Sequence, residues 1–295
     1  MLDVVLAPTG PLASGTDVPG QVALAQGGSA ATTARWLGRL GADVSLIAAV
    51  GRDAAGRALV DAIRADGVTA HVSRVAGART GRIGVLVDPG GERSFVADRG
   101  AADLLAPADL RASWFAGADA LHLPVYSLLG EPLGFAGREA IALARGAGAM
   151  ISVDLASIGP LLAGGRRAAQ TLVATIAPDV LFATSTEAEA FLGGRRIERL
   201  LDVAPTAVIK RGARGATVLT RVGGEGIRFE VATERLVVSD TTGAGDAFDA
   251  GFLVGWFAAQ RAGRSVPASL QRAVVAGHRA AARQLTSPRP ELALG

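Results

Sequence analysis

The chain of 295 residues contains no cysteine. Disulfide bonds and thiolate metal sites are therefore excluded, and a reducing compartment is compatible with the sequence. Hydrophobic residues make up 49% of the chain and charged residues 19%, so there is enough apolar material for a sizeable core. At this length the core can belong to one large domain or to two smaller ones.

Lysine and aromatic residues are scarce. Lys210 is the only lysine, and aromatic residues make up 4% of the chain. The formal net charge is +3 and the sequence pI is about 10.3, because nearly all the basic residues are arginines. These arginines are scattered, whereas nucleic-acid binders concentrate basic charge in a stripe or combine it with stacking aromatics. The composition therefore predicts no nucleic-acid partner.

Long apolar segments are absent as well. No basic and apolar leader opens the sequence, and no uninterrupted apolar run is long enough to span a bilayer. We therefore expect a cytoplasmic protein with no membrane partner.

Short apolar runs alternate with amphipathic helical patterns along the chain. The runs expected to form strands are residues 44–50, 118–123, 149–155, 180–183 and 207–210, with helices such as 54–65 and 134–145 between them. This alternation is typical of parallel strands buried between helices. Two hairpins depart from it: 81–87 with 92–97 around the turn signal 88–91, and 221–222 with 227–231 around the glycine-rich segment 223–226.

The most informative segment runs from Asp240 to Phe252 and reads DTTGAGDAFDAGF. It follows a short β-branched run, 236–239, and opens a long apolar helical pattern. A strand, a glycine turn and a helix N-terminus in this order form an anion site, because backbone N–H groups converge there and the helix dipole favours negative charge. Asp246 falls in the first helical turn, where a carboxylate can accept a proton from a hydroxyl that attacks phosphorus. The segment therefore predicts phosphoryl transfer.

Other interpretations of this segment exist. Asp246 and Asp249 can be ordinary first-turn acids that stabilise a helix dipole. The glycines can belong to a dinucleotide fold, but that fingerprint requires a third glycine or alanine where Phe248 stands, which disfavours an NAD-dependent oxidoreductase. No P-loop sequence occurs in the chain.

Together with a second segment, this motif resembles the signatures of the PfkB/ribokinase family of carbohydrate kinases. The second segment contains Gly27-Gly28-Ser-Ala-Ala-Thr-Thr-Ala34, then Leu40-Gly41-Ala42, and then Val50-Gly51-Arg-Asp53-Ala-Ala-Gly56. The resemblance implies a ribokinase-like three-layer α/β/α fold with a mostly parallel central sheet and a small β-lid. It also implies a single domain over residues 1–295, a lid formed by about 8–25 and 79–100, and a homodimer that pairs through this lid.

The resemblance further implies transfer of the γ-phosphoryl group of ATP to a hydroxyl of a small sugar or sugar-like molecule. Asp246 would be the base, and the N–H groups of Gly243, Ala244 and Gly245 would form the anion hole. Gly27, Gly28 and Thr32 would contact the sugar, and Arg99 is a candidate contact for an anionic acceptor or a solvated loop residue. Ribose, fructose, a sugar acid and a nucleoside all remain open as acceptors.

In the family, a buried first strand ends at a sugar-binding Asp. Alignment of the lid places Asp3 at that position, which leaves the first strand almost absent and implies either a start upstream or a missing strand. Alternatively, residues 3–7 are that strand in a shortened form, and Asp17 points into the lid. Asp3 is the favoured assignment.

The nucleotide side is also assigned by resemblance. Its expected ATP contacts are Thr184, Lys210, Gly212, Ala213, Gly215 and His278. Glu187 would organise Mg²⁺ through water, and the family also admits a monovalent cation. By local pattern, Thr186 is expected to cap a helix, with Glu189 three residues later.

Two positions depart from the family pattern. Threonine stands at positions 32 and 184, where the family usually has asparagine, and a hydroxyl lacks the forked reach of an amide. These departures motivate an alternative, a sugar- or nucleotide-binding protein with weak or lost catalysis.

Overall fold

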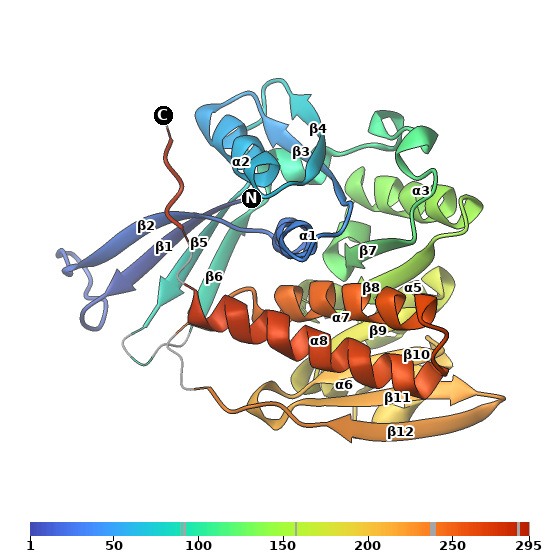
Figure 1. Ribbon diagram of the computed structural model, residues 1–295. Coiled ribbons are helices and arrows are strands. Elements are labelled where there is room, and N and C mark those ends of the chain that lie inside the picture. The colour runs from blue at the N-terminus through green and yellow to red at the C-terminus, as the bar shows by residue number, and fades with distance from the viewer. Residues whose placement is uncertain (89, 91–92, 157, 237–239, 288–289, 295) are drawn as a thin grey trace. The chain divides into compact units, whose positions relative to one another are not determined.

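The computed structural model describes residues 1–88, 90, 93–156, 158–236, 240–287 and 290–294 (Figure 1). Its contacts divide the chain into two compact units. Unit 1 comprises Met1–Leu105, Val237–Ala247 and Ala281–Gly295, and unit 2 comprises Ala106–Leu236 and Phe248–Ala280. The single domain over 1–295 stays a prediction. Both expected lid segments, 8–25 and 79–100, belong to unit 1.

Unit 1 contains two small sheets. Its four-stranded sheet has the order β2-β1-β5-β6, and we call it the lid sheet. The strands are β1 (Leu2–Pro8), β2 (Gly20–Gln26), β5 (Arg82–Val87) and β6 (Arg93–Asp98). β5 and β6 pair antiparallel, which confirms the first predicted hairpin, while residues 89, 91 and 92 of its turn lie outside the described residues.

The second sheet of unit 1 pairs β3 (Ser45–Gly51) and β4 (Thr69–Val75) in parallel. Helices α1 (Ser29–Arg39) and α2 (Ala54–Ala65) accompany it, and their apolar faces share a core with both strands. α2 has the predicted bounds because Asp53 caps it: its side chain accepts a hydrogen bond from the Gly56 N–H at 2.8 Å.

Unit 2 is built on a six-stranded sheet of order β12-β11-β10-β9-β8-β7. β7 (Ala120–Pro124), β8 (Met150–Asp154), β9 (Val180–Thr184) and β10 (Thr206–Lys210) run parallel. β11 (Ala216–Val222) and β12 (Glu225–Val231) add an antiparallel hairpin, as predicted. Most residues of the parallel strands are apolar and buried, since helices cover both of their faces.

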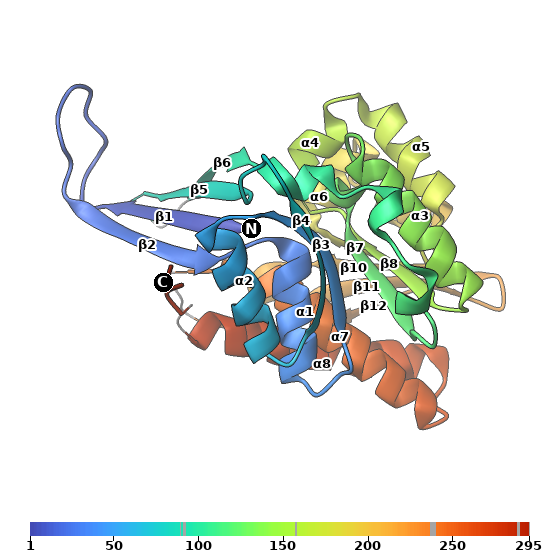
Figure 2. The same ribbon diagram turned by 90° about the horizontal axis from the view of Figure 1, so that it is seen from above.

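The helices of unit 2 form two layers around this sheet (Figure 2). One layer contains α3 (Leu133–Gly146), α4 (Ile158–Leu162), α5 (Arg166–Ile176) and α6 (Ser185–Leu192). The other contains most of α7 (Ala244–Arg261) and α8 (Val266–Thr286), which pack closely because glycines and alanines meet between them. A Cβ atom added at Gly251 would lie 2.6 Å from the carbonyl oxygen of Ala276. The predicted α/β class with a mostly parallel central sheet is confirmed.

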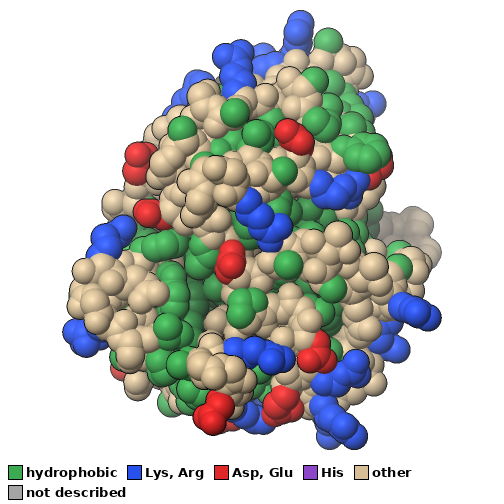
Figure 3. Space-filling view, turned by 90° about the vertical axis from the view of Figure 1, so that its right-hand side faces the viewer, with side chains coloured by type: hydrophobic (Ala, Val, Ile, Leu, Met, Phe, Trp, Pro, Cys, Tyr) green, Lys and Arg blue, Asp and Glu red, His purple; other side chains and the backbone are tan. Residues whose placement is uncertain are grey.

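The surface agrees with the scattered arginines of the sequence. On the face shown in Figure 3, basic side chains lie in several separate groups among acidic ones. Among the described residues, no helix combines the length and the apolar character needed to cross a bilayer.

Candidate active site

The glycine turn leads directly into α7. Gly243 has φ +76°, a left-handed conformation that favours glycine, and the helix begins at the next residue. Asp246 is half-buried in the first turn of α7, as predicted. The Ala244 N–H donates to the Thr241 carbonyl at 3.3 Å, so this expected anion donor already closes the turn. The expected strand at 236–239 lies, except for Leu236, outside the described residues.

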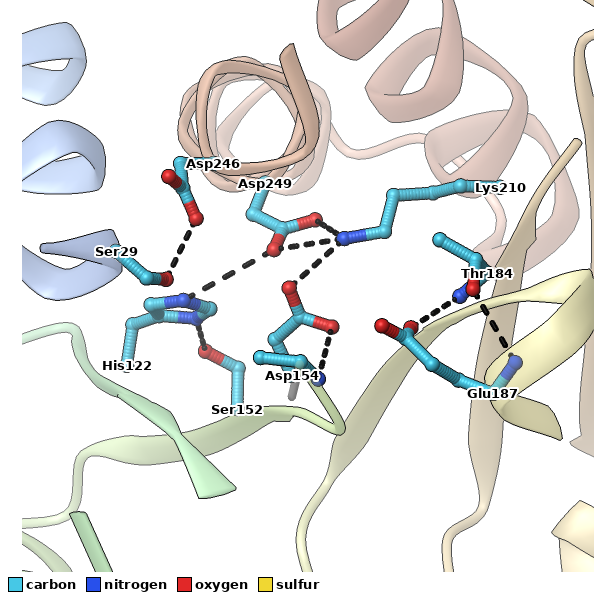
Figure 4. Close-up of polar contacts among 10 residues, drawn as sticks. Ser29, His122, Ser152, Asp154, Thr184, Glu187, Lys210, Asp246 and Asp249 are labelled. Atoms are coloured by element: carbon cyan, nitrogen blue, oxygen red, sulfur yellow. Dashed lines mark hydrogen bonds and ion pairs between the residues drawn. The ribbon is translucent and has the colours of Figure 1, made fainter. Parts of the chain in front are cut away.

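Asp246 has a partner that the sequence analysis missed. The Ser29 hydroxyl, at the start of α1, donates to Oδ1 of Asp246 at 2.5 Å (Figure 4). The two residues are 217 positions apart, so no local pattern connects them. This bond holds one carboxylate oxygen of Asp246 in a defined direction.

The predicted sugar residues lie close together in unit 1. Asp3 is buried at the beginning of β1, and a Cβ atom added at Gly27 would lie 1.7 Å from its Oδ1. Only glycine allows the chain to pass the Asp3 carboxylate this closely. Asp17, the alternative, is exposed between β1 and β2. β1 pairs with β2 and β5 in the lid sheet, so Asp3 stands at the start of a lid strand.

Two further candidates of this group are engaged elsewhere. The Thr32 hydroxyl donates to the Gly28 carbonyl at 3.2 Å, within its own helix, and its methyl group lies against Gly243. The Arg99 guanidinium is paired with the Asp103 carboxylate four residues later. An anionic acceptor would compete with Asp103 for Arg99.

The sole lysine is the centre of a buried ion cluster in unit 2 (Figure 4). Lys210 Nζ donates to Oδ2 of Asp154 at 2.9 Å and to both carboxylate oxygens of Asp249, at 3.1 and 3.2 Å. The Lys210 side chain is 10% exposed, that of Asp154 6%, and that of Asp249 0%. Lys210 ends β10, Asp154 ends β8, and Asp249 lies one turn after Asp246 on α7. The cluster therefore ties α7 to the carboxyl ends of two parallel strands.

The ionisation of this cluster follows from burial and pairing. Burial alone would lower the pKa of Lys210, but Asp154 and Asp249 raise it above its ordinary value. Burial alone would raise the pKa of Asp154, but the Lys210 ammonium holds it below its ordinary value. Nearby on β7, burial lowers the pKa of His122 to about 4, so this imidazole is neutral at pH 7. Its Nδ1 lies 3.0 Å from the Ser152 hydroxyl.

The loop after Lys210 has the expected tight form. The Arg211 N–H donates to the Gly215 carbonyl at 2.8 Å and closes one 3₁₀ turn, Gly212–Arg214, between β10 and β11. Gly212 and Ala213 lie in this turn, and Gly215 follows it. Their contact with ATP stays a prediction.

The expected helix cap at Thr186 and Glu189 is wrong. The capping box is formed by Thr184 and Glu187: the Thr184 hydroxyl accepts from the Glu187 N–H at 3.2 Å, and Oε2 of Glu187 accepts from the Thr184 N–H at 2.7 Å. β9 ends at Thr184 and the helix starts one residue later, so the cap falls two residues earlier than the pattern indicated.

The acid groups present suit a weakly held Mg²⁺. Among the described residues, no group of three or more His, Cys, Asp or Glu side chains could hold a metal. Mg²⁺ binds with several waters, substrate phosphates and one or two carboxylates, so this donor set fits it. Glu187 has one carboxylate oxygen, Oε2, in the capping box, and its contact with a water of the metal stays a prediction.

His278, one of the expected ATP contacts, packs against an aromatic ring. It lies on α8 with its ring centroid 5.4 Å from that of Phe248, and burial lowers its pKa. A neutral, half-buried imidazole beside Phe248 suits a flat aromatic partner, and its contact with adenine stays a prediction.

Comparison with known proteins agrees with this fold. The chain matches the pfkB family carbohydrate kinases over residues 1–292 and belongs to this family. It is 33% identical to a fructokinase of Klebsiella pneumoniae over 252 residues, which cover 81% of this chain and 79% of that protein. The chain is a carbohydrate kinase of the ribokinase-like fold.

Solved structures show the same similarity. The adenosine kinase of Sinorhizobium meliloti matches with a TM-score of 0.79 and 25% identity, over 100% of this chain and 94% of that one. The fructokinase of Vibrio cholerae O395, in its fructose-, ADP- and calcium-bound form, matches with a TM-score of 0.77 and 25% identity, over 99% of this chain and 93% of that one.

Proposed function

We propose that this kinase transfers the γ-phosphoryl group of ATP to a hydroxyl of a small sugar or nucleoside, with Asp246 as the base. The observation that carries the proposal is the position of Asp246: it lies in the first turn of α7, directly after the glycine turn, with one oxygen held by Ser29. The relatives named above are a fructokinase and an adenosine kinase, so fructose and adenosine are the first acceptors to test.

The proposed chemistry gives each of these groups one role. Asp246 takes the proton of the acceptor hydroxyl while the hydroxyl oxygen attacks the γ-phosphorus. The bond from that phosphorus to the oxygen that bridges it to the β-phosphate breaks, and ADP is released. The N–H groups of Gly243 and Gly245 would face the negative charge of the transferred group, aided by the positive end of the α7 dipole. The Ala244 N–H would join them on leaving the Thr241 carbonyl, to which it donates at 3.3 Å. When bound, Mg²⁺ would supply charge neutralisation for the phosphates, and Glu187 is the residue that would hold one of its waters.

The sugar site on this proposal is the surface around Asp3, Gly27 and Gly28. A buried carboxylate beside backbone that lacks side chains can accept hydrogen bonds from two neighbouring hydroxyl groups. Thr32, whose hydroxyl is engaged with Gly28, contributes shape through its methyl group. The alternative is a family member that binds sugar but does not turn it over efficiently. It rests on Thr32 and Thr184, which stand where the family usually has asparagine.

The experiment is an ADP-release assay with fructose, ribose, a ketodeoxy sugar acid and adenosine as acceptors. Asp246→Asn should lower kcat by about 10²–10⁴-fold and leave ATP affinity little changed, because it removes the base and keeps the shape. Asp61→Asn, at an exposed position of α2, is the matched control. Acceptor binding by calorimetry without ADP release would support the binding-protein alternative, and an Asp246→Asn protein within a few-fold of the parent would exclude Asp246 as base.

The lid sheet also supports a homodimer. Register places Leu6, Val22 and Val96 on one face of it, and they are 39%, 67% and 78% exposed. Exposed apolar side chains gathered on one face are typical of an interface. Val22→Asp should convert a dimer to a monomer in light scattering, whereas Phe135→Ser, at an exposed apolar position of α3, should not. A parent protein that is monomeric at micromolar concentration would exclude the shared lid.

A further inference from the structure

Arg93, at the start of lid strand β6, contacts the glycine turn through its guanidinium group. One of its terminal nitrogens donates to Oδ1 of Asp240 at 2.8 Å and also to the Thr242 hydroxyl, and the other donates to the Thr241 hydroxyl. Three consecutive side chains of the turn are thus held by one residue, and the Arg93 side chain is 17% exposed. No sequence pattern indicated this residue, which lies 147 positions before Asp240.

The turn is anchored on its other side by a different chain of contacts. Oδ1 of Asp240 accepts from the Thr242 N–H at 2.8 Å, and the Thr242 carbonyl accepts from the Gln284 side chain at 2.9 Å. The Gln284 side chain in turn accepts from the indole N–H of Trp36 at 2.8 Å. Gln284 therefore fixes the turn to α1 and α8, and Arg93 fixes it to the lid sheet.

This position gives Arg93 a geometric role more than an energetic one. Asp240 is 53% exposed, so its ion pair with Arg93 is screened by water and contributes little stability. A planar guanidinium with several donors nevertheless sets the direction of three side chains at once. The next residues, Gly243 to Gly245, carry the N–H groups whose aim decides how well they stabilise a transferred phosphoryl group.

We propose that Arg93 is a positioning residue for phosphoryl transfer: it holds Asp240, Thr241 and Thr242 so that the N–H groups of Gly243–Gly245 point toward the transferred phosphoryl group. Because Arg93 belongs to β6, the orientation of these N–H groups depends on the lid sheet. The proposal rests on the proposed function of the same turn. Arg93 acts through the turn and needs no contact with ATP or sugar. Its loss therefore lowers kcat and leaves both KM values nearly unchanged.

The kinetic test compares Arg93→Ala, Arg93→Lys and the control Arg82→Ala, which removes an exposed arginine from the other strand of the same hairpin. We expect kcat of Arg93→Ala to fall about tenfold or more, with each KM within about threefold of the parent, because the anion donors lose their preorganisation. The kcat of Arg93→Lys should lie between that of Arg93→Ala and that of the parent, since an ammonium keeps the charge but lacks the planar fork of donors. Millimolar guanidinium chloride should restore part of the kcat of Arg93→Ala and none of that lost in Asp246→Asn.

A second readout is independent of catalysis. Amide hydrogen exchange of the ligand-free protein should be faster over residues 240–247 in Arg93→Ala and unchanged there in Arg82→Ala. If the parent phosphorylates none of the acceptors, the proposed function fails, and exchange still decides whether Arg93 holds the turn. Parent-like exchange over 240–247 in Arg93→Ala, or a kcat within twofold of the parent, would overturn the proposal.

Discussion

Replacement of Lys210 by methionine is the most informative perturbation of stability in this protein. It keeps most of the side-chain volume and removes the ammonium that bonds to Asp154 at 2.9 Å and to Asp249 at 3.1 and 3.2 Å. Two carboxylates that are 6% and 0% exposed then remain beside each other without a cation. Breaking a buried ion pair in this way costs about 3–5 kcal/mol of the free energy of unfolding.

The two aspartates offer controls for this estimate. With Lys210 charged and His122 neutral, these four side chains carry one net negative charge. Asp154→Asn or Asp249→Asn makes that charge zero and leaves Lys210 one carboxylate partner. Each should cost only about 1–2 kcal/mol, the value of one lost charged hydrogen bond. The triple variant, which combines Asp154→Asn and Asp249→Asn with Lys210→Met, should recover much of the stability lost in Lys210→Met, since no buried charge remains in the cluster.

The pH dependence has a definite sign. In the parent, Lys210 holds the folded-state pKa of Asp154 below its unfolded value of 3.8, so this stabilisation is present above about pH 4 and is lost in stronger acid. Without Lys210, burial raises the folded-state pKa of the carboxyl groups. The folded variant then binds more protons than the unfolded chain, and its deficit shrinks as pH falls from 7 to 5.

Urea unfolding, followed by circular dichroism at pH 7 and pH 5, measures these differences for the parent and the four variants. At pH 7, Lys210→Met should lose the most free energy of unfolding, and each single aspartate variant should lose less. At pH 5, the difference in this free energy between Lys210→Met and the parent should be smaller than at pH 7. If Lys210→Met costs no more than Asp249→Asn, or if its deficit grows in acid, the electrostatic account of this cluster is refuted.

The other predictions concern metal, sugar and shape. Glu187→Gln should raise the Mg²⁺ concentration needed for half-maximal activity, because one anionic anchor of the metal's waters is lost; an unchanged Mg²⁺ titration with a slightly lower Tm would assign Glu187 to the capping box alone. Gly27→Ala should abolish sugar affinity in calorimetry, since the new Cβ would overlap the Asp3 carboxylate, whereas Gly146→Ala, with nothing within 4 Å, should be neutral. Thr32→Asn should strengthen sugar binding if the missing amide limits the site, and an unchanged affinity would show that the threonine site is already complete.

Local features were predicted well because their physics is local. α2 occupies residues 54–65 as expected, since its apolar periodicity and the Asp53 cap act within a few residues. The same holds for the β11–β12 hairpin and for the glycine turn before α7. The one local error, a cap at Thr186 in place of Thr184, arose because serine and threonine occupy three adjacent positions and the end of β9 decides which one caps.

The sequence by itself determined the α/β class, the family and the candidate base Asp246, because each depends on periodicity or on contiguous motifs. Only the tertiary structure decided which distant residues meet. Ser29 reaches Asp246 across 217 positions, Arg93 reaches Asp240 across 147, and Lys210 reaches Asp154 across 56. These pairs depend on strand order and on helix packing, which set separations in space that no short segment encodes. The contact of Lys210 with the nucleotide stays a prediction, whereas the two carboxylates that its ammonium contacts, Asp154 and Asp249, could not be connected to it from the sequence.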